Sequence, residues 1–270
     1  MGRGGPPEPE VAKVAPDIDA LLALSHSGRH AASDYLETAA LTGVETVGCR
    51  RCGGGLAGSV SISNVHQGAK LAIELAPDLV LFDGSGAAIP PIDTSRRVLV
   101  VNSAMDPDVV TGYLNGFRHL VSDLVVLTMA EEGSGWEELR DRAAELTPRV
   151  LATTLRPKPA EPVDGRTVAF FSTAPESAHE RLATHLRDEH GADVVHVSGS
   201  LNDRQKLREE LEQVEAEVFL VELNAAAIDV VAEAAATRGV AVVLAGSDVL
   251  SADGEDLDAE LLRLAEEATG

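Results

Sequence analysis

The sequence predicts an α/β protein built on a mostly parallel sheet. Short β-branched runs alternate along the chain with longer alanine- and leucine-rich stretches that have helical periodicity. The β-branched runs are continuously apolar instead of alternating with polar residues, which is typical of parallel strands covered on both faces. Apolar residues make up 44% of the 270 residues, enough for a sizeable core. These observations favour helices packed on both faces of a parallel sheet.

The apolar runs and the periodic stretches give the expected elements in order. Strands of a first series are expected at Val44–Gly48, Leu79–Asp83, Arg97–Asn102, Leu124–Thr128 and Val150–Leu155. Strands of a second series are expected at Thr167–Ser172, Asp193–Val197, Val218–Leu223 and Val240–Ala245. Helices are expected at Glu176–Glu189, Asp203–Val214, Ala226–Arg238 and Asp256–Glu267. The last helix is acidic and is expected to present a solvated face.

One segment interrupts this alternation. Residues 156–165 read RPKPAEPVDG, and three prolines and a glycine in ten residues are not expected to continue a helix or a central strand. A domain boundary is therefore predicted there. Residues 1–155 are expected to form a first, larger domain, residues 156–165 a linker, and residues 166–270 a smaller C-terminal α/β domain.

The charge of the chain restricts its partners. The formal net charge is −22, from 44 acidic and 22 basic residues, and such a field repels nucleic acid and anionic membranes. No apolar stretch approaches the roughly 20 residues that span a bilayer, and the N-terminus has no apolar signal region. A cytoplasmic location is expected. Only four basic residues are lysines, which suggests a salt-adapted archaeal source, with an acidic protein of a GC-rich bacterium as the alternative.

The two cysteines, Cys49 and Cys52, lie in a Cys-Arg-Arg-Cys motif. This spacing suits half of a zinc site or a redox pair. A closed zinc site needs about four ligands, and no second such motif completes it. Glycines follow where a redox motif would begin a helix. A structural or substrate-positioning role is therefore preferred to metal or redox chemistry.

A glycine-containing loop follows the expected strand Leu79–Asp83. In parallel sheets, ligands bind at the carboxyl ends of strands. Asp83 at such an end resembles a Walker-B acid that holds Mg²⁺, and the next residues, Gly84, Ser85 and Gly86, would let the backbone approach nucleotide phosphates. An ordinary turn after a strand is the alternative.

Cationic side chains are concentrated at three places in the acidic chain: Arg3, the pair Arg50 and Arg51, and the pair Arg156 and Lys158. The pair Arg50 and Arg51 precedes Gly53 and Gly54, so guanidinium groups and open backbone N–H groups lie together, as in a phosphate receptor. Salt bridges to neighbouring acids are the alternative for each of these residues.

Other polar residues support two interpretations each. His26 and His30 are either catalytic or part of a surface loop, and Asp34 would cap the next helix. Glu131 and Glu132 follow the expected strand Leu124–Thr128 and would bind nucleotide or metal, or else be solvated charges.

Seven blocks in order resemble the cyclic 2,3-diphosphoglycerate synthetase family: GRGGPPEPE, GRHAASDYLE, TVGCRRCGGGLAG, ISNV, FDGSGAAIPP, SDLVVLTMAEE and LRPKP. They span Gly2–Pro159. The resemblance implies a P-loop-NTPase-like core and a cytoplasmic, ATP-dependent and Mg²⁺-dependent ligase. Its substrate would be a small phosphorylated compound, 2,3-diphosphoglycerate, whose two phosphates are joined into a cyclic anhydride.

The resemblance also implies roles for residues. Asp83 would hold Mg²⁺, Gly84, Ser85 and Gly86 would bind nucleotide, and Arg3 would stabilise the transferring phosphate. Arg50, Arg51, Gly53 and Gly54, together with Arg156 and Lys158, would bind substrate, with Arg50 and Arg51 also catalytic.

Family members carry a P-loop upstream of the first block, and no G-x-x-x-x-G-K-[ST] occurs in the 270 residues. The chain is therefore expected to lack that segment, as a fragment, through a misplaced start or as one half of a split enzyme, and to act as a homodimer or with the missing segment. Two other functions stay open. One is a noncatalytic nucleotide-binding or phosphoester-binding fragment that needs a separate P-loop partner. The other is a different ATP-dependent ligase or kinase that acts on a phosphorylated acid.

Overall fold

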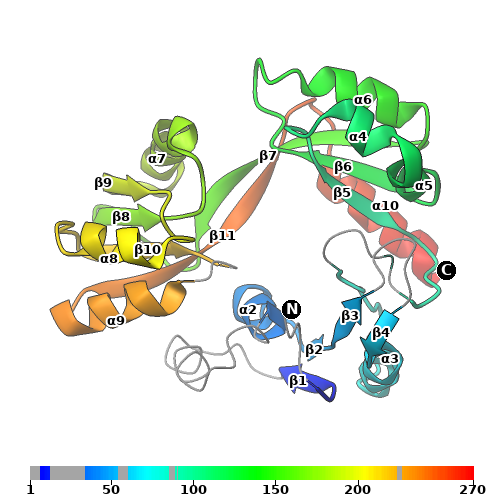
Figure 1. Ribbon diagram of the computed structural model, residues 1–270, viewed down its shortest axis with the longest axis horizontal. Helices are drawn as coiled ribbons and strands as arrows, with labels where there is room; N and C mark the ends of the chain where they lie inside the picture. The colour runs from blue at the N-terminus through cyan, green and yellow to red at the C-terminus, as the bar shows by residue number, and fades with distance from the viewer. Residues whose placement is uncertain (1–6, 13–33, 54–59, 85–88, 90, 224–226) are drawn as a thin grey trace. The chain divides into compact units, whose positions relative to one another are not determined.

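The computed structural model describes residues 7–12, 34–53, 60–84, 89, 91–223 and 227–270 (Figure 1). The chain forms two compact units. Unit 1 comprises Met1–Arg50 and Arg156–Asp248, and unit 2 comprises Arg51–Leu155 and Val249–Gly270. A seven-stranded sheet has the order β5-β6-β7-β11-β10-β8-β9, and two of its strands, β7 (Val150–Pro159) and β11 (Ala241–Ser251), contribute residues to both units. The predicted α/β class with a mostly parallel sheet is confirmed.

In unit 1, strands β8 (Thr167–Phe171), β9 (Asp193–Ser198) and β10 (Val218–Glu222) run parallel with β11. Successive side chains point to opposite faces of a strand. Val168, Phe170 and Leu220 therefore pack on one face with leucines of α7 (Glu176–His190).

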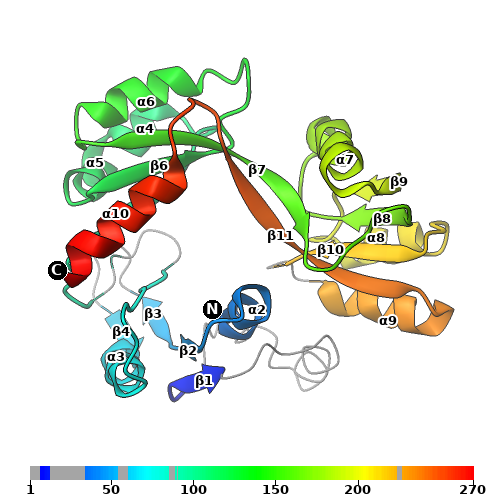
Figure 2. The same ribbon diagram turned by 180° about the vertical axis from the view of Figure 1, so that it is seen from behind.

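The other face of this sheet holds Ala169, Phe171 and Phe219, which pack with apolar side chains of α8 (Arg204–Leu211) and α9 (Ile228–Arg238). The two views show α7 on one side of these strands and α8 and α9 on the other (Figures 1 and 2). The helices predicted in this region are confirmed, and their ends differ from the predicted ones by at most three residues.

The first residues of unit 1 form a small separate sheet. Strand β1 (Glu10–Ala12) pairs antiparallel with β2 (Thr46–Gly48), and α2 (Asp34–Thr42) lies between them in the sequence. Asp34 begins α2, at the position predicted for the start of that helix. The predicted strand Val44–Gly48 is thus present in shortened form, but it does not join the parallel sheet.

In unit 2, β5 (Val98–Asn102) and β6 (Leu124–Thr128) are parallel to each other, and β6 is parallel to β7. One face packs with side chains of α4 (Pro107–Thr111) and α6 (Trp136–Ala144), and α5 (Tyr113–Leu120) lies between these helices in the sequence. A hairpin, β3 (Arg51–Gly53) with β4 (Val60–Ser63), leads to α3 (Val65–Glu74).

The other face of the unit 2 strands packs with α10 (Leu257–Thr269). Leu264 and Leu257 of α10 contact Leu124, Val126 and Leu151. The expectation of a solvated acidic helix is therefore wrong for one side of it. Leu257 and Leu264 are seven residues apart and so lie on one side of the helix, whereas Leu261 and Leu262 are exposed.

The predicted strand Leu79–Asp83 is absent. These residues belong to no sheet, and the side chain of Leu81 is 83% exposed. An apolar run becomes a strand only where another strand supplies hydrogen-bond partners. None of the described strands pairs with this run.

The predicted break at residues 156–165 begins too early. Strand β7 continues through Pro157 to Pro159. Two bonds place β7 antiparallel to β11: Ala252 N–H donates to the Ala152 carbonyl at 2.8 Å, and Ala160 N–H donates to the Leu244 carbonyl at 2.8 Å. Hydrogen-bonded positions alternate in such a pair, so the nitrogens of Pro157 and Pro159 point away from β11 and no ladder bond is lost.

The compact units do not coincide with the predicted domains, because each unit takes residues from two separate stretches of the chain. The predicted domain boundaries themselves remain a prediction.

No helix among the described residues is both long enough and apolar enough to cross a membrane.

Candidate functional site

The carboxyl ends of the unit 2 strands form one candidate binding edge. Because β5 and β6 are parallel, Asn102 and Thr128 lie at the same edge of the sheet. The N–H of Ser103 donates to the Thr128 carbonyl at 2.9 Å, while its buried Oγ finds no hydrogen-bond partner among the described residues. Met129 has φ of 59°, a strained backbone for a residue with a side chain. Ligands bind at such edges in parallel α/β sheets.

Arg51 joins two of the loops that the sequence singled out. It begins β3, and its Nη1 donates to the Ile89 carbonyl at 2.7 Å. Ile89 closes the loop that starts at Asp83 and Gly84, both of which are exposed. Unit 2 therefore brings the arginine loop to the loop of the Walker-B-like acid. The bond occupies one of the five guanidinium N–H groups, and the buried Nε group finds no hydrogen-bond partner among the described residues.

Arg50 follows a tightly packed strand end. A Cβ on Gly48 would lie 2.5 Å from Cδ1 of Tyr35, so only glycine lets the ring approach this closely. The Tyr35 hydroxyl donates to Glu10 Oε2 at 2.6 Å and fixes the ring.

Cys49 is a free cysteine, and burial raises the pKa of its thiol, which disfavours the thiolate that redox or zinc chemistry requires.

Arg156 and Lys158 lie two residues apart on β7 and so on one face of it. The Lys158 ammonium is 2.8 Å from Asp248 Oδ1, and its side chain is 61% exposed. The salt-bridge alternative thus holds for Lys158, although an ammonium has two further donors. Near Asp248 lie two histidines of α7, His185 and His190.

Several predicted site residues have no described side-chain geometry. Arg3, Gly54, Ser85 and Gly86, as well as His26 and His30, lie outside the described residues. Cys52 and Gly53 belong to β3 and lie opposite Ile62 and Val60 of β4, with a register shift between them. Past the carboxyl end of β6, Glu131 is half-buried and Glu132 is exposed.

Comparison with known proteins identifies the family. A family model described as "Cyclic 2,3-diphosphoglycerate synthetase, P-loop domain" matches residues 1–153, and one described as "Cyclic 2,3-diphosphoglycerate synthetase C-terminal domain" matches residues 159–248. The chain belongs to the cyclic 2,3-diphosphoglycerate synthetase family. The P-loop model matches although the motif G-x-x-x-x-G-K-[ST] is absent from these residues.

Relatives of this synthetase family align along nearly the whole chain. The cyclic 2,3-diphosphoglycerate synthetase of Rubrobacter xylanophilus is 49% identical over 99% of the chain and 62% of its own length. That of Methanothermus fervidus is 40% identical over 90% of the chain and 55% of its own length. That of Thermococcus kodakarensis is 37% identical over 100% and 64%. The chain thus spans less than two thirds of these relatives.

Sequence reasoning missed Ser103 and the group of His185, His190 and Asp248. Ser103 follows the correctly predicted strand Arg97–Asn102, and its place at the carboxyl end of a parallel strand was the available signal. The expected strand Val240–Ala245 stops before Asp248, whereas β11 continues to Ser251. No spacing rule connects Asp248 with residues of α7 so far away in the sequence.

Proposed function

We propose that the chain serves ATP-dependent formation of cyclic 2,3-diphosphoglycerate from 2,3-diphosphoglycerate. The observation that carries the proposal is the Arg51–Ile89 bond, which joins the arginine loop to the Asp83 loop within unit 2. The relatives that carry the synthetase name cover almost the whole chain, which favours this function over a noncatalytic phosphoester-binding fragment.

The proposed reaction has two steps. The terminal phosphoryl group of ATP passes to one substrate phosphate, and ADP leaves. An oxygen of the other substrate phosphate then attacks the phosphorus of the activated one, so that a P–O–P bridge closes and inorganic phosphate departs. Both steps bring strongly negative groups together, so the protein has to hold them in line and offset their repulsion.

The cationic residues suit that task. In an acidic chain of net charge −22, Arg50 and Arg51 would bind substrate phosphates through planar N–H pairs, as guanidinium groups do best. Arg156 and Lys158 are proposed as a second group of phosphate ligands, and Arg3 as the residue that stabilises the transferring phosphate.

The carboxylate oxygens of Asp83 are suitable ligands for Mg²⁺. The carboxylate is exposed beside Gly84, and Mg²⁺ is usually held by one or two carboxylates together with substrate phosphates. Asp83 would hold the ion, while the loop at residues 84–86 would lie against the nucleotide phosphates. When bound, the ion would neutralise phosphate charge.

The experiment is an assay of the purified chain in concentrated salt, which suits its acidic composition. ATP, Mg²⁺ and 2,3-diphosphoglycerate are supplied, and ³¹P NMR distinguishes the cyclic anhydride from the monoesters. A chimera, in which the chain is joined to the parts of the Rubrobacter xylanophilus relative that lie outside the aligned region, is assayed in parallel. The proposal expects cyclic product and equimolar phosphate from at least one protein, and it fails if neither forms the product.

Variants of the active protein test the residue roles. Asp83→Asn should lower the rate by about 10²–10³-fold, the usual loss when one group that stabilises transition-state charge is removed. Asp78→Asn makes the same charge change at an exposed acid five residues earlier and should leave the rate unchanged. Equal rates for the two variants would remove Asp83 from the proposed site.

A further inference from the structure

Unit 1 contains a group of metal-ligating side chains away from the Asp83 loop. His185 Nε2 and His190 Nε2 lie 4.0 Å and 3.9 Å from the same oxygen, Asp248 Oδ2. One potential ligand atom from each residue lies within 4.8 Å of the other two. The rings of His185 and His190 are 5.4 Å apart and nearly perpendicular. Three donor atoms thus converge on one small volume.

The two histidine nitrogens are buried without partners. Neither Nε2 is accessible to solvent, and neither finds a hydrogen bond among the described residues. Their separation from Asp248 Oδ2 is too long for a direct hydrogen bond. Two buried imidazole nitrogens that face one carboxylate oxygen at this distance leave a gap between the three atoms, which a bound cation would fill.

The surroundings of His185 favour its neutral form. Burial lowers the pKa of His185, and the nearby His190 and Arg156 lower it further, against the opposing effect of Asp248 and Glu189. A neutral imidazole has the free lone pair that a metal ion requires.

The two carboxylate oxygens of Asp248 have different neighbours. Lys158 Nζ is 2.8 Å from Oδ1, so that oxygen is occupied and Oδ2 is left to the histidines. Partners of this kind commonly orient metal-ligating carboxylates.

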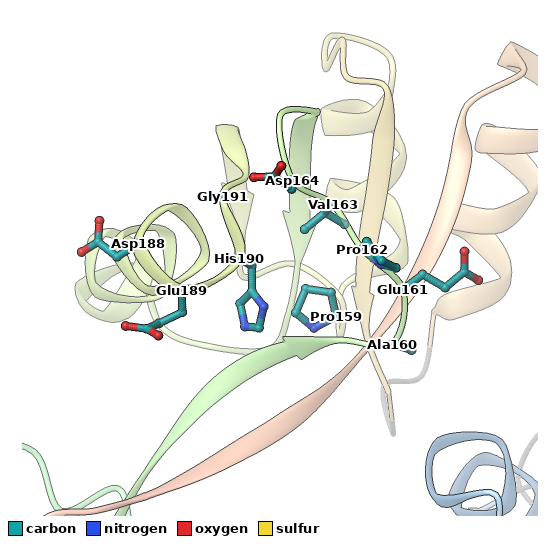
Figure 3. A pocket seen from close by; sticks show the side chains of 10 residues that line it. All are labelled: Pro159, Ala160, Glu161, Pro162, Val163, Asp164, Asp188, Glu189, His190 and Gly191. Atoms are coloured by element: carbon teal, nitrogen blue, oxygen red, sulfur yellow. The ribbon is translucent and has the colours of Figure 1, made fainter.

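Lys158 and Arg156 would also repel a cation. The charges of Asp248 and Glu189 act on His185 in the opposite direction. His190 also lines a hollow of about 560 Å³, in which the carboxylates of Asp188 and Glu161 point away from its ring (Figure 3). The hollow is open to solvent.

We propose that His185, His190 and Asp248 bind a divalent transition-metal ion, with zinc as the best match. Two imidazoles and one carboxylate suit zinc and its neighbours in the first transition series, whereas Mg²⁺ and Ca²⁺ prefer oxygen ligands alone. The ion would link the end of α7 to β11 within unit 1. This inference does not depend on the synthetase reaction.

The test uses Co²⁺ as a spectroscopic probe on the whole chain after chelator treatment. We expect one equivalent to bind with the visible absorption of a four- or five-coordinate site, and zinc to displace it. His185→Gln and Asp248→Asn should each weaken binding by more than the roughly 10–100-fold that loss of a supporting residue produces. His179→Gln on the same helix is the matched control and should bind cobalt normally, as should a Cys49→Ser, Cys52→Ser double variant.

A second measurement needs no variant. Zinc added to the unmodified chain should shift the ring NMR signals of His185 and His190 and leave that of His179 in place. The inference is overturned if the chain binds no cobalt, if His185→Gln and Asp248→Asn retain full affinity, or if the cysteine variant abolishes binding. Unshifted His185 and His190 signals at saturating zinc would overturn it as well.

Discussion

The parallel strands of unit 1 and those of unit 2 are covered differently. Residues of β8 and β10 are almost all buried, because apolar helices pack on both faces. In β5 of unit 2 burial alternates, and Val98 and Val100 are 42% and 62% exposed. The second face of the unit 2 strands is covered over β6 and β7 by α10. Unit 1 is thus closed over β8 and β10, whereas β5, the outermost strand of unit 2, keeps one face open; β9, the outermost strand of unit 1, is likewise open at Val195, which is 49% exposed.

This difference bears on where stability and chemistry reside. A strand buried on both faces contributes dense packing, and each deleted methylene group there leaves a cavity. A strand exposed on one face tolerates substitution on that face. The loops with the proposed Asp83 and Arg51 roles belong to unit 2, where binding segments have fewer packing constraints. Matched substitutions in the two units measure this difference.

The largest expected effect is in the closed core of unit 1. Phe171 is fully buried, and its ring meets that of Phe219 edge-on at 5.3 Å. Phe171→Ala should lower the free energy of unfolding by about 3–5 kcal/mol, from lost burial and the cavity that remains. Urea unfolding followed by circular dichroism gives the value. Val100→Ala in β5 should change the free energy of unfolding by less than about 0.5 kcal/mol.

The comparison fails if the two substitutions have similar effects. A large loss for Val100→Ala would show that another surface covers β5 in solution. The slope of the urea curve should stay constant, since a changed slope would mean that a variant alters the unfolded or native ensemble instead of the packing.

A second prediction compares ion pairs. In unit 1, Arg204 donates to both carboxylate oxygens of Asp229, at 2.8 Å and 2.5 Å, and the Asp229 side chain is only 10% exposed. In unit 2, Arg142 contacts Asp108, whose side chain is 81% exposed. Asp229→Asn should destabilise the protein by about 1.5–3 kcal/mol, as for a hydrogen-bonded buried charge. Asp108→Asn should cost about 0–1 kcal/mol.

Thermal or urea unfolding at low and high salt separates the two cases. The effect of Asp108→Asn should shrink in 1 M salt, because exposed charges are screened, while that of Asp229→Asn should persist. Loss of the Asp229→Asn effect in salt would contradict a buried pair.

The same contrast explains what the sequence predicted. Runs such as Thr167–Ser172 and Val218–Leu223 were placed to within a residue, because strands buried on both faces must be continuously apolar. Leu79–Asp83 has the same local pattern and is no strand, since pairing depends on a partner that local pattern does not reveal. The prolines of β7 led to the wrong prediction of a break for a related reason. A proline interrupts a strand only where its missing N–H would have pointed at the neighbouring strand, and the local sequence does not give that direction.

The candidate site was also predictable only in part. Residue types and loop positions suggested Arg51 and Asp83, but the contact of Arg51 with Ile89 arises from tertiary folding. The group of His185, His190 and Asp248 depends on the length of β11 and on the packing of α7 near it. Neither the Arg51 contact nor this group of three residues can be predicted from local periodicity.

The smallest expected effect concerns two exposed acids and pH. Glu217 in unit 1 accepts a hydrogen bond from the Thr167 N–H at 2.8 Å, and this bond, with the Thr167 hydroxyl, lowers the pKa of Glu217. Glu267 in unit 2 has a pKa lowered chiefly by the Arg96 guanidinium at 3.0 Å. A lowered pKa in the folded state stabilises the protein above the unfolded value of about 4.3, and this stability is lost as the pH falls through the folded value.

Glu217→Gln and Glu267→Gln should therefore each lower stability near neutral pH, and each difference from the unmodified chain should shrink below about pH 4. The two acids differ in their partners: a backbone N–H is fixed by β8, whereas a guanidinium at the surface is screened. In 1 M salt the Glu267→Gln difference should nearly vanish while the Glu217→Gln difference remains. Urea midpoints measured from pH 3 to pH 7 at both salt concentrations give the comparison. If both differences disappear in salt, the Thr167 N–H does not hold Glu217 in solution, and the start of β8 is less rigid than its hydrogen bonds indicate.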